Sequence, residues 1–239
     1  MNSALLRKVT GWLLIIGPLV DVLANILRPG SFPSEHPDGP QATLQAMVQD
    51  SAANPTMVHL LVDVEFFAAL GLLLGFWGVS RVMGDTDKRG FLRKYGMLLF
   101  GVAIAVRTAG VAMGFVMALI TSYIAPGAPP GALDTAVMFL VMEGALAVFA
   151  TILIVLGIAL FAVSMTDTGL IGADKPLAYL LAVIPAVVAT ILLLMAPLVE
   201  GNLIAMYAAG NVASLIPVAW MVLLGLAFIR KSDALPATS

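Results

Sequence analysis

The chain has 239 residues, of which 61% are hydrophobic and 11% are charged, and its formal net charge is −2. Soluble domains are about 45–50% apolar and about 25% charged, so this composition excludes a soluble globular protein and predicts a polytopic membrane protein. The net charge of −2 gives the chain no overall basic field, and we expect no nucleic-acid partner. Because the chain has no cysteine, it has neither a disulfide framework nor a thiolate metal site.

Six apolar segments are each long enough to cross a membrane, which takes roughly 20 residues for about 30 Å of hydrocarbon. They cover about Val9–Leu27, Met57–Met83, Tyr95–Ile124, Leu133–Met165, Leu177–Val199 and Leu203–Ile229. Helices satisfy their own backbone groups in lipid, and the runs are continuous rather than alternating as in a β-barrel. We therefore predict an all-α fold with six transmembrane helices forming a single domain over residues 1–239.

The distribution of Lys and Arg predicts the orientation of these helices, since basic residues gather on the cytoplasmic side. Ten of the 12 basic residues lie on one side of the predicted spans: Arg7, Lys8, Arg81, Lys88, Arg89, Arg93, Lys94, Lys175, Arg230 and Lys231. Only Arg28 lies on the other side, and Arg107 lies inside a span. We expect both termini, the basic loop 84–94 and the tail 231–239 to be cytoplasmic, in a plasma membrane of bacterial type.

An alternative concerns the first apolar segment. Basic residues followed by an apolar run that ends in Val22-Leu23-Ala24 also describe a signal peptide with a small-residue cleavage site. However, Asp21 and Asn25 flank that site, and cleavage would leave five spans. We therefore favour a retained helix.

The one long connection predicted outside the membrane covers residues 28–55. Its first part, PGSFPSEHPDGP, is rich in turn residues. Its second part, Gln41–Ala53, places Leu44, Met47 and Val48 on one helical face, which predicts a short amphipathic helix lying in the interface. We favour the interpretation that this connection is a lid that only packs against the ends of neighbouring helices, over the interpretation that it is a gate for a substrate.

Ionisable side chains inside spans are the strongest functional signal, because each costs about 2.5–3.5 kcal/mol on insertion scales unless it has a partner or water. At about 1.5 Å per residue, their depths fall in one layer of the membrane. The candidate polar or ion site consists of Asp21, Asn25, His59, Asp63, Glu65, Arg107, Glu143 and Asn211.

The second predicted helix holds three of these residues. His59 and Asp63 are four residues apart and share a face, whereas Glu65 lies about 200° around the helix from Asp63. Since lipid on either face would be unfavourable, we expect this helix to be contacted on both sides. Small residues four apart, Gly71 with Gly75 and Gly110 with Gly114, predict close helix packing.

The predicted layer holds more acids than bases, with four carboxylates facing Arg107 and His59. One interpretation is a structural network, as in an accessory membrane subunit without a site of its own. Another is proton- or cation-linked transport, in which Glu65 pairs with Arg107, Asp63 exchanges the ion and His59 relays it to the outer surface.

A metal-dependent intramembrane enzyme is the third interpretation. His59, Asp63 and Glu143 form a nitrogen-plus-two-carboxylate set of the kind that binds iron, manganese or zinc. However, the sequence lacks any His-x-x-His or Glu-x-x-His pair, and a di-iron bundle would need two of the latter. We therefore expect no cofactor, no catalytic residue and no resident metal.

The stretch KYGMLLFGVAIAVRTAGVAMG, which follows HLLVDVEFFAALGLLLGFWGVSRVM, resembles an uncharacterised bacterial family of six-helix membrane proteins grouped as a domain of unknown function. The resemblance covers most of the chain and rests on apolar motifs around the intramembrane Arg107. It implies a six-helix fold and no particular activity. Protein partners other than the lipid bilayer stay open.

Overall fold

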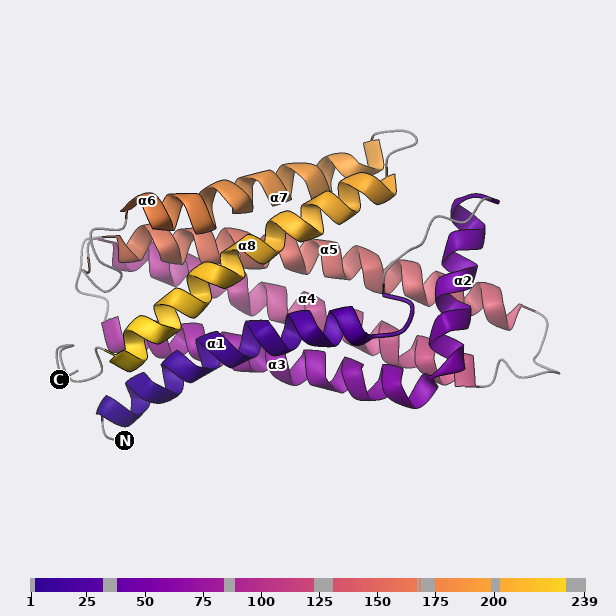
Figure 1. The fold of residues 1–239 in the computed structure, drawn as a ribbon, viewed down its shortest axis with the longest axis horizontal. Coiled ribbons are helices and arrows are strands. Elements are labelled where there is room, and N and C mark those ends of the chain that lie inside the picture. The colour runs from indigo at the N-terminus through magenta and orange to yellow at the C-terminus, as the bar shows by residue number, and fades with distance from the viewer. Residues whose placement is uncertain are drawn as a thin grey trace. The chain divides into compact units, whose positions relative to one another are not determined.

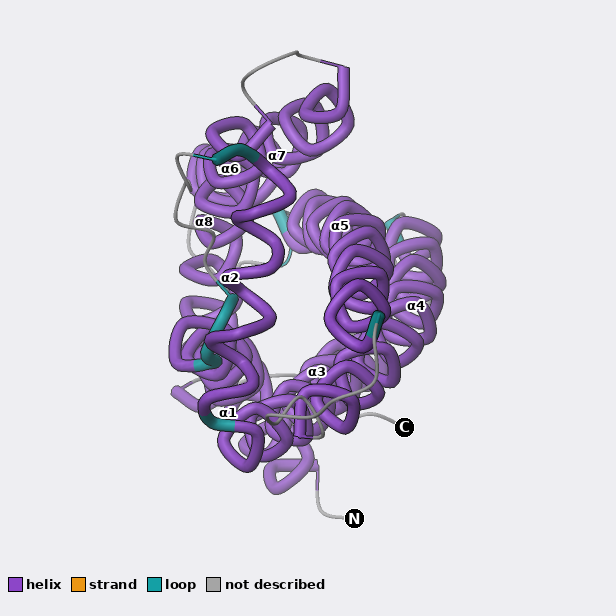
Figure 2. Tube along the Cα trace, turned by 90° about the vertical axis from the view of Figure 1, so that its right-hand side faces the viewer, coloured by secondary structure: helices purple, strands orange, loops and turns teal. Residues whose placement is uncertain are grey.

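A computed structural model of the chain describes residues 3–31, 38–83, 89–122, 131–166, 168, 175–198 and 203–230. All regular structure in these ranges is helical (Figure 2), and six helical segments are long and apolar enough to cross a membrane. The predicted all-α, six-span fold is confirmed. His36, the part of the basic loop at 84–88 and the tail 231–239 lie outside the described residues.

The helix bounds agree with the predicted spans to within a few residues, except that the first and third spanning helices begin earlier, at Ser3 and Gly90 rather than at Val9 and Tyr95. The helices are α1 (Ser3–Leu27), α2 (Pro40–Ala53), α3 (Pro55–Met83), α4 (Gly90–Ser122), α5 (Ala132–Met165), α6 (Lys175–Ala178), α7 (Ile184–Met195) and α8 (Leu203–Arg230). Between α6 and α7 the chain makes a π-helical turn, η1 (Tyr179–Val183), and η2 (Ala196–Leu198) is a short 3₁₀ segment. The wide turn η1 precedes Pro185, whose ring and missing N–H do not fit a regular helix interior.

Contacts between residues divide the chain into two compact units. The first unit comprises Met1–Leu19, Ala68–Ile104 and Ala150–Ser239, and the second comprises Val20–Phe67 and Ala105–Phe149. Four helices, α1, α3, α4 and α5, contribute residues to both. Each unit has its own apolar cluster.

The first unit is held by aromatic packing and by close approach of helix backbones. Phe76 stacks on Phe100 at 4.1 Å between ring centroids and lies 4.6 Å from Phe161. A Cβ atom on Gly11 would lie 2.6 Å from the Gly225 carbonyl oxygen, so α1 and α8 cross where neither has a side chain. Helices α7 and α8 lie side by side in this unit (Figure 1).

The second unit includes the predicted short helix α2, which runs across the direction of the part of α3 that follows it (Figures 1 and 2). Val48 on α2 is fully buried in a cluster with Val58 and Val62 of α3 and Met117 of α4. Burial of a Val side chain contributes roughly 1.5–3 kcal/mol. The apolar face of α2 therefore docks on the neighbouring helices.

Candidate functional site

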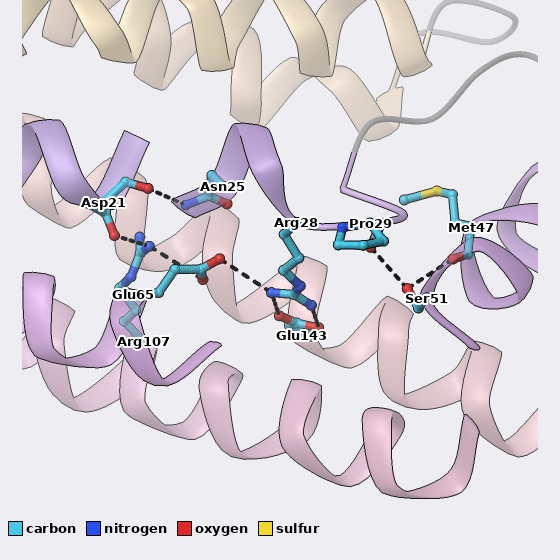
Figure 3. Close-up of polar contacts among 9 residues, drawn as sticks. All are labelled: Asp21, Asn25, Arg28, Pro29, Met47, Ser51, Glu65, Arg107 and Glu143. Carbon is cyan, nitrogen blue, oxygen red and sulfur yellow. Dashed lines mark hydrogen bonds and ion pairs between the residues drawn. The ribbon is translucent and has the colours of Figure 1, made fainter. Parts of the chain in front are cut away.

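Five charged side chains of the second unit form a chain of ion pairs in which acids and bases alternate (Figure 3). We call this set the polar network; its members are Asp21, Arg107, Glu65, Arg28 and Glu143. They come from α1, α4, α3, the turn after α1, and α5. The network joins four helices at one level, as the depth estimates predicted for the four members that lie within spans.

The two ends of the polar network are short ion pairs. Arg107 Nη2 lies 2.5 Å from Asp21 Oδ1. Arg28 binds Glu143 with two nitrogens, Nη1 at 2.5 Å from Oε1 and Nη2 at 2.6 Å from Oε2. Parallel contacts of this kind are the strongest geometry available to a guanidinium and a carboxylate.

Glu65 occupies the middle of the network, and its contacts are longer. Its Oε1 lies 3.6 Å from Arg28 Nη1 and its Oε2 lies 3.8 Å from Arg107 Nη2. The residue is only 4% exposed, and Oε1 accepts no hydrogen bond from the described part of the chain. Glu65 is therefore a buried carboxylate held by two cations without a close partner of its own.

Helical periodicity places Glu65 and Asp63 on different faces of α3, and only one of these faces is buried in the chain. The two residues lie about 200° apart around α3, and the structure places Glu65 in the buried face and Asp63 in the exposed face. The expectation that neighbours cover both faces of this helix is wrong for the single chain. Asp63 consequently does not lie beside Arg107, whose carboxylate neighbours are Asp21 and Glu65.

The turn after α1 positions Arg28. Gly30 has φ +75°, and a Cβ atom there would lie 2.3 Å from the Met47 carbonyl oxygen, so only glycine fits. The Ser51 hydroxyl lies within hydrogen-bond distance of the carbonyl oxygens of Pro29 (3.1 Å) and Met47 (3.0 Å). Helix α2 is thereby attached to the turn that carries the guanidinium.

Glycines of α4 make room for Glu143. A Cβ atom on Gly114 would lie 2.7 Å from Glu143 Oε1, and one on Gly110 would lie 3.3 Å from Leu146 Cβ. The predicted close packing at this pair of glycines is confirmed. Without a side chain at Gly114, the Glu143 carboxylate fits between α4 and Arg28.

The charge balance differs from the one that the sequence predicted. Arg28 adds a second cation and exposed Asp63 leaves the cluster, so three acids meet two arginines and the network carries −1 when all five groups are ionised. Burial lowers the pKa of the Arg28 guanidinium, but hydrogen bonding and attraction to Glu143 and Glu65 outweigh burial and raise that pKa above its ordinary value. Arg28 is therefore charged.

The remaining predicted residues lie beside the network or away from it. Asn25 donates a hydrogen bond from Nδ2 to the Asp21 backbone carbonyl at 3.2 Å. His59 packs edge-on against Phe115, with 4.7 Å between ring centroids. Asn211 is half-buried on α8 and belongs to the first unit.

The structure does not assemble the metal-ligand set suggested by the sequence. Glu143 is bound to Arg28, whereas Asp63 is exposed. In the described ranges, no three His, Asp or Glu side chains form a group that could hold a metal ion.

Arg28 is the network residue that the sequence interpretation missed. The sequence prediction places Arg28 in the outer loop, because it follows the last apolar residue of the first span. Its isolation is the signal that could have identified it, since it is the one basic residue on its side of the predicted spans. An arginine retained there next to an apolar helix indicates an internal acidic partner.

Comparisons with known proteins identify no relative, so the interpretation of the site rests on its geometry. The chain matches no protein-family model, no curated protein and no solved structure.

Proposed function

We propose that this polytopic membrane protein carries out proton-linked transport, with Glu65 as the group that takes up and releases the proton. The observation that supports this most directly is the charge pattern of the polar network. Asp21–Arg107 and Arg28–Glu143 are complete one-to-one pairs at 2.5–2.6 Å, and Glu65 is the carboxylate left over. Uptake of one proton by Glu65 leaves two neutral pairs and no uncompensated charge.

Protonation of either end carboxylate would be less favourable. If Asp21 were neutral, Arg107 would keep only Glu65 at 3.8 Å, and if Glu143 were neutral, Arg28 would keep only Glu65 at 3.6 Å. A short ion pair would be lost in each case, in a region where the interaction is weakly screened. The middle position therefore favours Glu65 as the exchanging group in place of Asp63.

A metal cation at the same site is the less favoured form of the proposal. Hard cations such as Ca²⁺ take several oxygen ligands at once, and the nearest carboxylate oxygens are already occupied by guanidinium groups. Two arginines within 4 Å of Glu65 also repel a cation. A proton needs only one oxygen atom.

A structural role is the alternative that the short pairs favour. Asp21–Arg107 and Arg28–Glu143 join α1 to α4 and the turn after α1 to α5, and such a network could specify helix packing in an accessory subunit. A plasma-membrane location with cytoplasmic termini is part of our proposal and rests on the distribution of Lys and Arg.

Proton-linked transport and a purely structural role predict different effects of Glu65→Gln, a change that imitates the protonated state of Glu65. We would reconstitute the wild type, Glu65→Gln and the matched control Asp134→Asn, which removes an exposed carboxylate from the start of α5. Vesicles loaded with a pH-sensitive dye would receive a panel of small polar and zwitterionic solutes under an imposed pH difference. We expect solute-dependent proton movement in the wild type and the control, and none in Glu65→Gln.

The melting temperature in detergent provides the folding control. We expect it to be unchanged or raised in Glu65→Gln, because both short pairs remain. Equal proton movement in wild type and Glu65→Gln, or none with any solute, would contradict the proposal and favour the structural role. Replacing Na⁺ by choline should leave the flux unchanged, and a loss of flux would identify a metal cation instead.

A further inference from the structure

Asp63 is an exposed carboxylate within the candidate span Pro55–Met83. Its side chain makes no hydrogen bond or ion pair with the part of the chain that the structure describes. Charged side chains inside spans are rare, cost several kcal/mol and almost always face protein or water. Its exposure therefore indicates that something outside the single chain covers this face of α3.

The neighbours of Asp63 show that it lies inside the apolar belt. Leu60 is 62% exposed and Phe67 is 68% exposed, and Met57 further toward the start of α3 is exposed as well. Met57 lies six residues from Asp63, or about 9 Å along the helix. Long Lys and Arg side chains can extend to the membrane surface from such a depth, but the single methylene group of Asp cannot.

His59 provides a complementary group on the same chain. It lies one turn from Asp63 toward the start of α3, and its ring is partly exposed beside Phe115. The second unit contains only two Lys or Arg residues, Arg28 and Arg107, and both are in the polar network. The imidazole of His59 is therefore the hydrogen-bond donor near this level that a second copy of this unit can offer to Asp63.

We propose that the exposed face of α3 around Asp63 binds the same face of a second copy of this chain. Both copies insert in one direction, so a twofold axis perpendicular to the membrane makes the two α3 helices parallel. In a parallel pair, side chains at one level meet each other and those three or four residues away. Each Asp63 then lies near the other Asp63 and within one turn of the His59 residues, whose ring N–H groups can donate hydrogen bonds to the two carboxylates.

Polar side chains hydrogen-bond across membrane helices and thereby favour association. The exposed Leu60 and Phe67 on either side of Asp63 supply the apolar contact around this cluster. The inference rests on the exposed face of α3 and is independent of the function proposed for Glu65, which lies on the opposite face.

Cysteine cross-linking can test the dimer directly, because the native chain has no cysteine. We would place one cysteine at Leu60, because Leu60 of one chain lies opposite Leu60 of the other chain across the proposed axis. The purified protein would then be oxidised in vesicles at increasing dilution with lipid. The matched control is Val141→Cys, which is exposed on α5. We expect a disulfide-linked dimer for Leu60→Cys that persists on dilution, and none for Val141→Cys.

Variants of the polar pair test whether Asp63 and His59 carry the contact. In the Leu60→Cys background, Asp63→Leu should abolish the dimer while the melting temperature of the monomer is retained. Exchanging the two residues, His59→Asp with Asp63→His, should restore it. The proposal is overturned if Leu60→Cys stays monomeric after dilution. It is also overturned if the Asp63→Leu variant cross-links with the same efficiency as the protein with native Asp63 and His59.

Discussion

Replacing Arg28 by Met should strongly destabilise the protein, because it removes the cation from a buried two-point contact. Arg28 holds Glu143 at 2.5 and 2.6 Å and lies 3.6 Å from Glu65. Met keeps a long apolar side chain in place, so the change removes charge with little change in packing. It leaves Glu143 without a cation in a site of low polarity.

The expected magnitude follows from the geometry. Removing one partner of a buried ion pair costs about 3–5 kcal/mol in soluble proteins, because the other charge is left uncompensated. The pair in the polar network has two hydrogen bonds between charged groups, and each such bond contributes about 1.5–3 kcal/mol. We therefore expect Arg28→Met to lower the free energy of unfolding by about 3–5 kcal/mol.

A double-mutant cycle separates this charge effect from packing. Glu143→Met alone should also destabilise the protein, whereas Arg28→Met with Glu143→Met should recover much of the loss, since apolar residues can replace a buried pair at little cost. Unfolding would be followed by circular dichroism in mixed micelles with increasing denaturing detergent. A loss below about 0.5 kcal/mol for Arg28→Met, or additive effects in the double variant, would refute the buried pair.

Three further changes test the parts around the network. Gly114→Ala should lower the melting temperature, because the new methyl group would lie 2.7 Å from Glu143 Oε1. The control Gly144→Ala should be neutral or stabilising, because a Cβ atom there has no atom within 4 Å. Equal effects of the two variants would contradict the position of the Glu143 carboxylate beside Gly114. Ser51→Ala should weaken the attachment of α2 by about 0.5–1.5 kcal/mol and speed hydrogen exchange in that helix, and unchanged exchange would count against it. Reporter fusions after Met83 should report the cytoplasm and fusions within residues 32–37 the outside, and a cytoplasmic signal from 32–37 would disprove the predicted orientation.

The number and extent of the spans could be predicted from the sequence alone. Apolar runs such as the one over Leu133–Met165 have no other stable form in lipid, because helices alone satisfy each backbone group within the segment. The same local reasoning identified α2 from the spacing of Leu44, Met47 and Val48. These features depend on neighbours within a few turns, and local sequence contains that information.

The sequence also determined that Asp63 and Glu65 must point in opposite directions, but not which of them would be buried. That choice depends on the packing of the whole face of α3, where Val58, Val62 and Glu65 form one buried stripe. Asp63 falls in the opposite stripe. Helical periodicity fixes relative directions, and only contacts with other helices decide which direction is inward.

The partners within the polar network could be identified only from the three-dimensional packing of the helices. Arg28 and Glu143 are 115 residues apart, and their pairing depends on the turn at Gly30 and on the space that Gly114 leaves beside the carboxylate. Pro29-Gly30 marks a turn in the sequence, but nothing in the residues that flank Arg28 shows that this turn brings the guanidinium to Glu143. Charge is a property of single residues, whereas charge balance in a low-dielectric site depends on which side chains the fold brings within about 4 Å of each other.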